Sequence, residues 1–379
     1  MERSLLNMIK PQSRGQVNLL EALRNQKYEI VGIFGPTGTG KSLFSILYGV
    51  ESVLNERYKR FIIARPLIDV TSGNEITPAD IGELYYELAL SYLRDILYGY
   101  VDWKSIEDLI KNYRIVLADS HYLRGRTFDD SLIFLDDSQS ISLESAIEVI
   151  TRIGNRSRLI IAGDPIFQRP TESKNSILLL RELLLNEDSA KVIDLGLRDI
   201  VRPGAKKGIK LLLESKMRSR KLNETEKQIV DVARVHAPDA DLITVVDLID
   251  LKKKLDISSE NTPDSLIIVK EGHLGRIIGK KGERIEAIEK DVGLKIRATQ
   301  LSLDLLPLIK AVHPVGWIIK HIVEADFAGP FMIVKIDEEA YGAFVGQRGV
   351  YARFIDGVLN RLIGASVRVY EAKSQESRK

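Results

Sequence analysis

The chain has 379 residues, of which 44% are hydrophobic and 28% are charged, and its formal net charge at pH 7 is +2. This composition excludes a wholly disordered chain, and the length allows two or three domains. Cysteine is absent, which excludes disulfides, thiolate metal sites and a cysteine nucleophile. The sequence has no apolar run of membrane-spanning length and no signal-peptide core at its start, so we expect a cytoplasmic protein.

The N-terminal half alternates short apolar runs with amphipathic stretches. Five runs are typical of buried strands: Tyr28–Phe34, Arg60–Ala64, Arg114–Ala118, Ser131–Leu135 and Arg158–Ala162. Three stretches between them have a helical pattern: Lys41–Asn55, Ile81–Tyr98 and Leu143–Ile153. This alternation predicts an α/β fold with a parallel sheet covered by helices on both faces. Ligands of such sheets bind beyond the carboxyl ends of the strands.

A complete phosphate-binding motif follows the first predicted strand. It consists of Gly35, Pro36, Thr37, Gly38, Thr39, Gly40, Lys41 and Ser42. In this motif the backbone amides surround phosphate oxygens, the lysine reaches the β- and γ-phosphates, and the serine hydroxyl ligates Mg²⁺. A chance glycine-rich turn is the alternative, but the strand before the motif and the helix after it favour binding of ATP with Mg²⁺.

Acidic residues follow two other predicted strands. Asp136 and Asp137 come after Ser131–Leu135, and Asp164 comes after the last predicted strand. We interpret Asp136 as a Mg²⁺ ligand and Asp137 as the residue that polarises the attacking water. Asp164 is expected to sense the γ-phosphate through a water. The alternative for Asp136 and Asp137 is an acidic turn that merely ends a strand or caps the next helix.

Several motifs in order resemble the PhoH-like ATPases, whose fold is similar to the first RecA-like core of superfamily 1 helicases. Besides the phosphate-binding loop they are Ala64–Pro66, Arg124–Asp130, Asp136–Gln139, Thr151–Gly154, Gly163–Pro165 and Asp199–Arg202. The resemblance covers about residues 10–215. It implies a RecA-like P-loop NTPase whose single core takes part in an oligomer, which we expect to be a hexamer.

The resemblance also implies roles for residues outside the phosphate-binding loop. Gln16 matches a glutamine that contacts adenine, and Gln139 a residue that links the chemistry of Asp137 to the neighbouring strand. Arg202 matches an arginine finger or sensor. The positions implied to contact nucleic acid are Arg65, Arg124, Arg126 and Thr127.

Two positions depart from the family pattern. Asp137 stands where a glutamate is usual, which predicts altered water geometry and slow turnover. Gln168 lies three residues after Pro165 instead of two, which leaves its role open.

Two glycine-x-x-glycine turns lie 67 residues apart in the C-terminal region. The first is Gly279, Lys280, Lys281 and Gly282, and the second is Gly346, Gln347, Arg348 and Gly349. Each follows a predicted strand (Ser265–Lys270 or Phe331–Ile336) and precedes an apolar-periodic helix and another strand. The first resembles a KH domain, a module that binds about four unstacked nucleotides, and the second resembles a more divergent copy. Between them, we expect Trp317 to lie in the core.

We therefore expect four segments. Residues 1–222 form the ATPase domain, 223–262 a helical and polar linker, 263–300 a first KH domain of α+β fold, and 301–379 a second KH-like domain with a basic tail. The expected function is an ATP-dependent motor or remodeler in which the KH domains bind single-stranded RNA. The alternatives are an ATPase that acts on DNA and a nucleotide-gated nucleic-acid-binding protein with little turnover.

Overall fold

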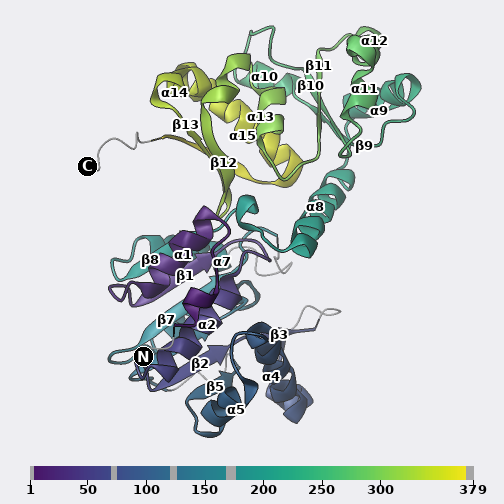
Figure 1. Cartoon of the computed structure of the whole chain (residues 1–379). Coiled ribbons are helices and arrows are strands. Elements are labelled where there is room, and N and C mark those ends of the chain that lie inside the picture. Colours follow the sequence, from purple (N-terminus) through teal and green to yellow (C-terminus); the bar gives the residue numbers. More distant parts are fainter. Residues whose placement is uncertain (1–3, 70–74, 120–125, 168–175, 373–379) are drawn as a thin grey trace. The chain divides into compact units, whose positions relative to one another are not determined.

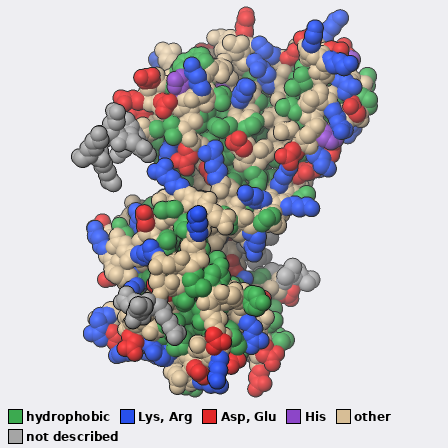
Figure 2. Space-filling view, in the orientation of Figure 1, with side chains coloured by type: hydrophobic (Ala, Val, Ile, Leu, Met, Phe, Trp, Pro, Cys, Tyr) green, Lys and Arg blue, Asp and Glu red, His purple; other side chains and the backbone are tan. Residues whose placement is uncertain are grey.

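The protein divides into two compact units, Met1–Ala205 and Lys206–Lys379 (Figure 1). The structure is a computed structural model that describes residues 4–69, 75–119, 126–167 and 176–372. Among these residues, no helix combines the length and the apolar character needed to cross a bilayer. Figure 2 shows acidic and basic side chains interspersed over the visible face of each unit, as the small net charge leads one to expect.

The N-terminal unit is built on one six-stranded parallel sheet. The strand order is β5-β2-β6-β7-β1-β8. The strands are β1 (Ile30–Phe34), β2 (Arg60–Ala64), β5 (Ile115–Ala118), β6 (Ser131–Leu135), β7 (Arg158–Gly163) and β8 (Ala190–Asp194). The predicted parallel sheet is confirmed, and β8 is a further strand. Its half-exposed edge position explains why it lacks the continuous apolar run of the other strands.

Helices cover both faces of this sheet, because alternate strand residues face opposite sides. Val31 and Ile33 lie in one core, and Ile30 and Phe34 lie in the other. The helices of the first core are α1 (Arg14–Arg24), α2 (Lys41–Leu54), α4 (Glu83–Leu97) and α5 (Trp103–Lys111). Those of the second are α6 (Leu143–Ile150) and α7 (Ser176–Leu185). Short elements complete the unit: η1 (Leu6–Met8), β3 (Leu67–Ile68), β4 (Glu75–Ile76), α3 (Pro78–Ile81), η2 (Ser138–Ser140) and η3 (Leu197–Asp199).

The C-terminal unit contains two small sheets with the same topology. Each belongs to a set that contains, in chain order, a helix, two strands, two helices and a third strand, with α10 (Ile249–Lys254) inserted between the first two strands of the first set. In each sheet the central strand is antiparallel to one neighbour and parallel to the other. The first set is α9 (Glu224–His236), β9 (Leu242–Asp247), β10 (Ser265–Val269), α11 (Leu274–Ile278), α12 (Glu283–Val292) and β11 (Ile296–Gln300). The second is α13 (Leu306–Val312), β12 (Ile322–Ala328), β13 (Phe331–Ile336), α14 (Glu338–Val345), α15 (Val350–Ile363) and β14 (Ser366–Glu371).

Further elements of the chain are α8 (Pro203–Arg218), α10 (Ile249–Lys254), η4 (Lys280–Gly282), η5 (Gly316–His321) and η6 (Gln347–Gly349). Two expectations need correction here. The stretch 223–262 is not only a linker, because α9 and β9 lie within it and β9 pairs with β10. Trp317 is not a core residue, since 51% of it is exposed on η5 while its neighbour Ile318 is buried.

Candidate functional site

The phosphate-binding loop joins β1 to α2. Gly38 and Gly40 have φ angles of +80° and +95°, which residues with a Cβ rarely adopt, so the path of the loop requires glycine there. The Lys41 ammonium donates hydrogen bonds to the carbonyl oxygens of Gly35 (2.7 Å) and Pro36 (2.9 Å). Burial lowers the pKa of Lys41 from its ordinary value. The loop thus places a buried cation at the start of a helix, where backbone amides favour an anion.

Three carboxylates lie at the carboxyl ends of the adjacent strands β6 and β7. Asp136 and Asp164 are buried, at 1% and 2% exposure, and the side chain of Asp137 is 31% exposed. Burial, followed by repulsion from Asp137, raises the pKa of Asp136. The Ser42 hydroxyl is hydrogen-bonded to the Asp136 carboxylate. A hydroxyl and a carboxylate together are oxygen donors of the kind that Mg²⁺ prefers, so this pair fits the predicted ion.

Gln139 joins the two strand ends through both ends of its amide. Its Nε2 donates to Asp137 Oδ1 at 3.3 Å, and its Oε1 accepts from the Asp164 backbone amide at 3.0 Å. Asp137 has φ +49° and ψ +39°, a left-handed conformation that aspartate tolerates because its short side chain can bond locally. That conformation gives a physical reason for an aspartate here. The geometry is that of a positioned carboxylate.

Arg65, at the end of β2, lies beside these carboxylates. Its Nε and Nη2 lie 2.8 Å and 2.7 Å from Asp137 Oδ2. Its guanidinium also stacks over the Tyr92 ring, 4.0 Å from the centroid, and the Tyr92 hydroxyl donates a hydrogen bond to Asp136 Oδ2. Sequence reasoning missed Tyr92, because it lies in the middle of α4 with no motif around it.

Gln16 lies next to the phosphate-binding loop but its amide is engaged by the protein. Its Nε2 donates to the Thr39 carbonyl oxygen at 3.0 Å, and its Oε1 accepts from the Gln12 amide at 2.8 Å. The start of α1 is held by Asp199, whose carboxylate accepts hydrogen bonds from the amides of Gly15 (3.1 Å) and Gly196 (2.8 Å). Asp199 therefore anchors the helix that carries Gln16, a role that its motif alone does not indicate.

Arg202 contacts the phosphate-binding loop of its own chain. Its Nη2 donates to the Thr37 hydroxyl at 3.1 Å, and the preceding residue, Val201, donates its amide to the Gly38 carbonyl oxygen at 3.0 Å. This position fits the sensor interpretation of Arg202 better than that of a finger reaching a neighbouring subunit.

Of the four expected nucleic-acid residues of the ATPase half, the three that the structure describes do not lie together. Arg124 falls outside the described residues. Arg126 and Thr127 are exposed and precede β6, so they lie near the amino edge of the sheet, whereas Arg65 lies at its carboxyl edge. Thr127 lines a pocket of about 1130 Å³ together with Tyr28 and Arg156, and no residue of the phosphate-binding loop lines it.

The two glycine-x-x-glycine turns have the same backbone geometry. The three positive φ angles are +78°, +53° and +92° in residues 279–282, and +74°, +54° and +77° in residues 346–349. A Cβ on Gly279 would lie 2.7 Å from the Arg284 side chain, and one on Gly346 would lie 2.6 Å from the Tyr351 ring. Both turns therefore require glycine, and each presents two exposed polar side chains between its glycines.

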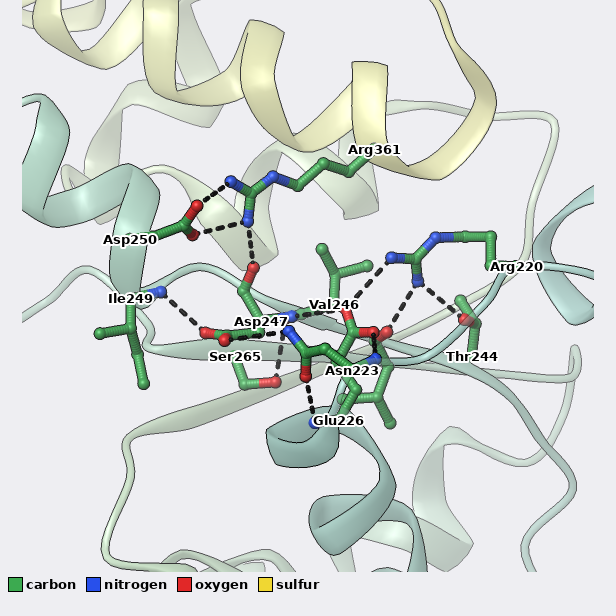
Figure 3. A network of polar contacts seen from close by, with 11 residues as sticks. Arg220, Asn223, Glu226, Thr244, Val246, Asp247, Ile249, Asp250, Ser265 and Arg361 are labelled. Atoms are coloured by element: carbon green, nitrogen blue, oxygen red, sulfur yellow. Dashed lines mark hydrogen bonds and ion pairs between the residues drawn. The ribbon is translucent and has the colours of Figure 1, made fainter.

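Figure 3 shows a polar network that joins the two small sheets of the C-terminal unit. Arg361 on α15 contacts both carboxylate oxygens of Asp250, at 2.9 Å and 2.7 Å, and the carbonyl oxygen of Asp247 at 2.5 Å. Arg220, just before α9, contacts Glu226, which also accepts the Asp247 amide at 3.0 Å. The network fixes α15 of the second set against the end of β9 of the first.

Two solved structures that the chain matches have low overall similarity to it. The large terminase of a thermophilic bacteriophage has 13% identity and a TM-score of 0.34, over 56% of this chain and 51% of that one. The Pif1 helicase from Candida albicans has 11% identity and a TM-score of 0.25, over 69% of this chain and 64% of that one. These values carry no argument about function.

Sequence comparison is more specific. A KH domain model matches residues 243–311, which confirms the first predicted KH domain. PhoH-like proteins of Bacillus subtilis and Synechocystis are 29% and 28% identical, over 51% and 47% of this chain and 60% and 54% of theirs, so the chain matches little more than half the length of each. The model of the PhoH-like protein matches residues 8–214, more than half of the chain, and the chain therefore belongs to the PhoH-like protein family.

Proposed function

We propose that the protein hydrolyses ATP and couples hydrolysis to the binding of single-stranded RNA. The observation that carries this proposal is the Gln139 amide, which ties Asp137 to the Asp164 strand end beside the buried Lys41 and Asp136. A site that only bound nucleotide would have no need of a second, positioned carboxylate next to the candidate metal ligand.

The residues divide the chemistry among themselves. Lys41 and the loop amides hold the β- and γ-phosphates. Ser42 and Asp136 would hold Mg²⁺, which supplies neutralisation of phosphate charge when bound. Asp137 orients the attacking water by accepting its hydrogen bond, with Gln139 fixing the direction of the carboxylate. Arg202 acts as a sensor of the nucleotide through its contact with Thr37 of the phosphate-binding loop in the same chain.

For the C-terminal unit we propose that both turns bind one strand of RNA. Three observations support this: the shared topology of the two sheets, the shared φ angles of the two turns, and the Arg361 contacts that hold the sheets together. Turns held at a fixed separation raise the effective concentration of the second for a strand already bound to the first.

The ring assembly is a separate proposal. We propose a homo-oligomer, with a hexamer as the resemblance implies, because a single RecA-like core has no second core to complete its site. Since Arg202 contacts the loop of its own chain, a neighbouring subunit would have to supply a different group. A monomeric mass in the presence of nucleotide would contradict the ring.

Phosphate release by the full chain, with Lys41→Ala as the blank, tests the enzyme. The reaction is run alone and with RNA or DNA oligonucleotides of the same length and sequence. RNA stimulation that is weak with DNA supports the proposal, because the 2′-hydroxyl distinguishes the two. Equal stimulation favours an ATPase that acts on either strand. Release equal to the blank in every condition leaves a nucleotide-gated binding protein, an alternative that the Arg65–Asp137 ion pair favours.

The role of the first turn is tested by Lys280→Asp with Lys281→Asp, which keeps both glycines and reverses the charge. Aspartate also tolerates the positive φ of position 281. The matched control is Lys253→Asp with Lys254→Asp, at two consecutive exposed lysines on α10. RNA stimulation should be lost in the first double variant and kept in the control. Equal effects would mean that general charge, and not the turn, binds the RNA.

A further inference from the structure

Helix α4 places two tyrosines against the catalytic edge of the sheet, although it belongs to the excursion between β2 and β5. Tyr85 and Tyr92 are seven residues apart, two helical turns, and so lie on one face of the helix. Leu93 and Leu97 of the same helix are buried in the core under the sheet. The helix is therefore anchored by packing, and its tyrosines are held where they lie.

Both tyrosines contact groups of the nucleotide site. The Tyr92 hydroxyl donates to Asp136 Oδ2 and is also hydrogen-bonded to Ser42, so it lies among the two candidate Mg²⁺ ligands. The Tyr85 hydroxyl donates to the backbone carbonyl oxygen of Arg65 at 3.2 Å. Tyr85 thus holds the backbone of Arg65, and the Tyr92 ring packs against its guanidinium.

These contacts occupy both oxygens of Asp136 and one oxygen of Asp137. Asp136 Oδ1 accepts the backbone amide of Asp137 at 3.0 Å, and Oδ2 accepts the Tyr92 hydroxyl. Asp137 Oδ2 is paired with Arg65. A carboxylate oxygen that already accepts a hydrogen bond competes less well for a metal, and one paired with a guanidinium is a weaker hydrogen-bond acceptor for water. Both carboxylates are thus restrained at once.

We propose that Tyr92 and Arg65 form a latch that restrains Asp136 and Asp137, and that a phosphate group of the bound nucleic acid opens it by drawing Arg65 away. The Arg65 side chain is 34% exposed, so a phosphate can approach it without displacing the helix. Guanidinium groups bind phosphate as readily as carboxylate. Loss of Arg65 removes the cation stacked on Tyr92, and the hydroxyl is then held by its hydrogen bonds alone. The latch rests on the proposed function, because it regulates that same site.

The first test is the Mg²⁺ dependence of binding of a fluorescent ATP analogue to the full chain, which needs no turnover. Tyr92→Phe keeps the ring that packs under Arg65 and removes only the hydroxyl. We expect the Mg²⁺ concentration for half-maximal binding to fall by about ten- to hundredfold, the worth of one hydrogen bond to a charged group. The matched control is Tyr98→Phe at the end of the same helix, where the side chain is 85% exposed.

Three outcomes overturn the latch. Tyr92→Phe requires as much Mg²⁺ as Tyr98→Phe, it requires more Mg²⁺, or neither variant nor the native chain shows any Mg²⁺ dependence. More Mg²⁺ would mean that Tyr92 aligns Asp136 for the ion instead of restraining it. Phosphate release is measured on the same samples, and native release equal to that of Lys41→Ala sinks the proposed hydrolysis without deciding the binding result.

The second test addresses the opening of the latch. In the native chain a saturating single-stranded RNA should lower the required Mg²⁺, but by no more than Tyr92→Phe does, because the Tyr92 hydroxyl is still present. Arg65→Gln should lower it without RNA, and adding RNA should then change nothing further. A response of native size to RNA in Arg65→Gln would show that phosphate at Arg65 is not the trigger.

Discussion

Arg158 gives the sharpest stability prediction, because a guanidinium with 2% exposure holds the end of α1. Its Nη1 donates to the Leu23 carbonyl oxygen at 2.7 Å and to the Tyr48 hydroxyl at 2.9 Å. Its Nη2 donates to the carbonyl oxygens of Ala22 and Asn25, both at 2.8 Å. Arg158 thus satisfies carbonyl groups that the last turn of a helix leaves without partners.

Arg158→Met keeps an unbranched apolar stem, shorter than that of arginine, and removes all four hydrogen bonds. At about 1 kcal/mol for each buried partner left unsatisfied, the free energy of unfolding of the N-terminal unit should fall by about 4 kcal/mol. Whole domains are commonly stable by only about 5–15 kcal/mol. The variant should therefore fold, but with a large part of its stability lost.

Urea unfolding followed by tryptophan fluorescence checks this value in a Trp317→Phe background. In that background the signal comes from Trp103 alone, which lies in the N-terminal unit. With a urea dependence of about 1–3 kcal/mol per M, the midpoint should fall by more than about 1 M. Arg156→Met is the control, because that arginine lies two residues away with a side chain 77% exposed, and it should barely move the midpoint. Equal shifts in the two variants would refute the argument from buried hydrogen bonds.

Three further predictions concern the C-terminal unit. For the first two, unfolding of this unit is measured by Trp317 fluorescence in a Trp103→Phe background. Burial lowers the pKa of His313 from about 6.5, so below that pH the unfolded chain binds more protons than the folded chain. The stability of the folded unit, complete above about pH 6.5, should therefore decline as the pH falls. His313→Asn should flatten that decline, and an unchanged slope would contradict the prediction. Gly342→Ala, inside α14 with open space around it, should stabilise by about 0.5–1 kcal/mol, whereas Gly364→Ala, at φ +71°, should destabilise by about 1 kcal/mol; urea midpoints moving the same way would contradict the conformational argument. Arg361→Ala should weaken binding of an RNA long enough for both turns but not of a four-nucleotide RNA, and an equal loss for the two lengths would contradict the proposed bridging role.

Contiguous features were open to prediction from the sequence because their geometry is local. The phosphate-binding loop and both glycine-x-x-glycine turns depend on glycines at positive φ, and glycine at those spacings is written in the chain itself. The same holds for the strands of the parallel sheet, whose unbroken apolar runs reflect burial on both faces. The acids after β6 and β7 follow from where the strands end.

Contacts between distant segments were beyond prediction. Tyr92 and Asp136 are 44 residues apart, and Gly15 and Asp199 are 184 residues apart; no spacing rule connects either pair. The stretch 223–262 contains α9, which buries one face, and β9, of which residues 243–246 are all buried. The pairing of β9 with β10 is made only in the folded unit.

By itself, then, the sequence determined the type of each local site, since a glycine pattern or a strand end sets the backbone conformation over a few residues. The tertiary structure alone decided which side chains meet at those sites. It brought Tyr92 to Asp136, Arg65 to Asp137 and Arg202 to Thr37 of its own loop. The physical reason is that the packing of whole helices and strands, and not the residues adjacent in the chain, sets the distance between such groups.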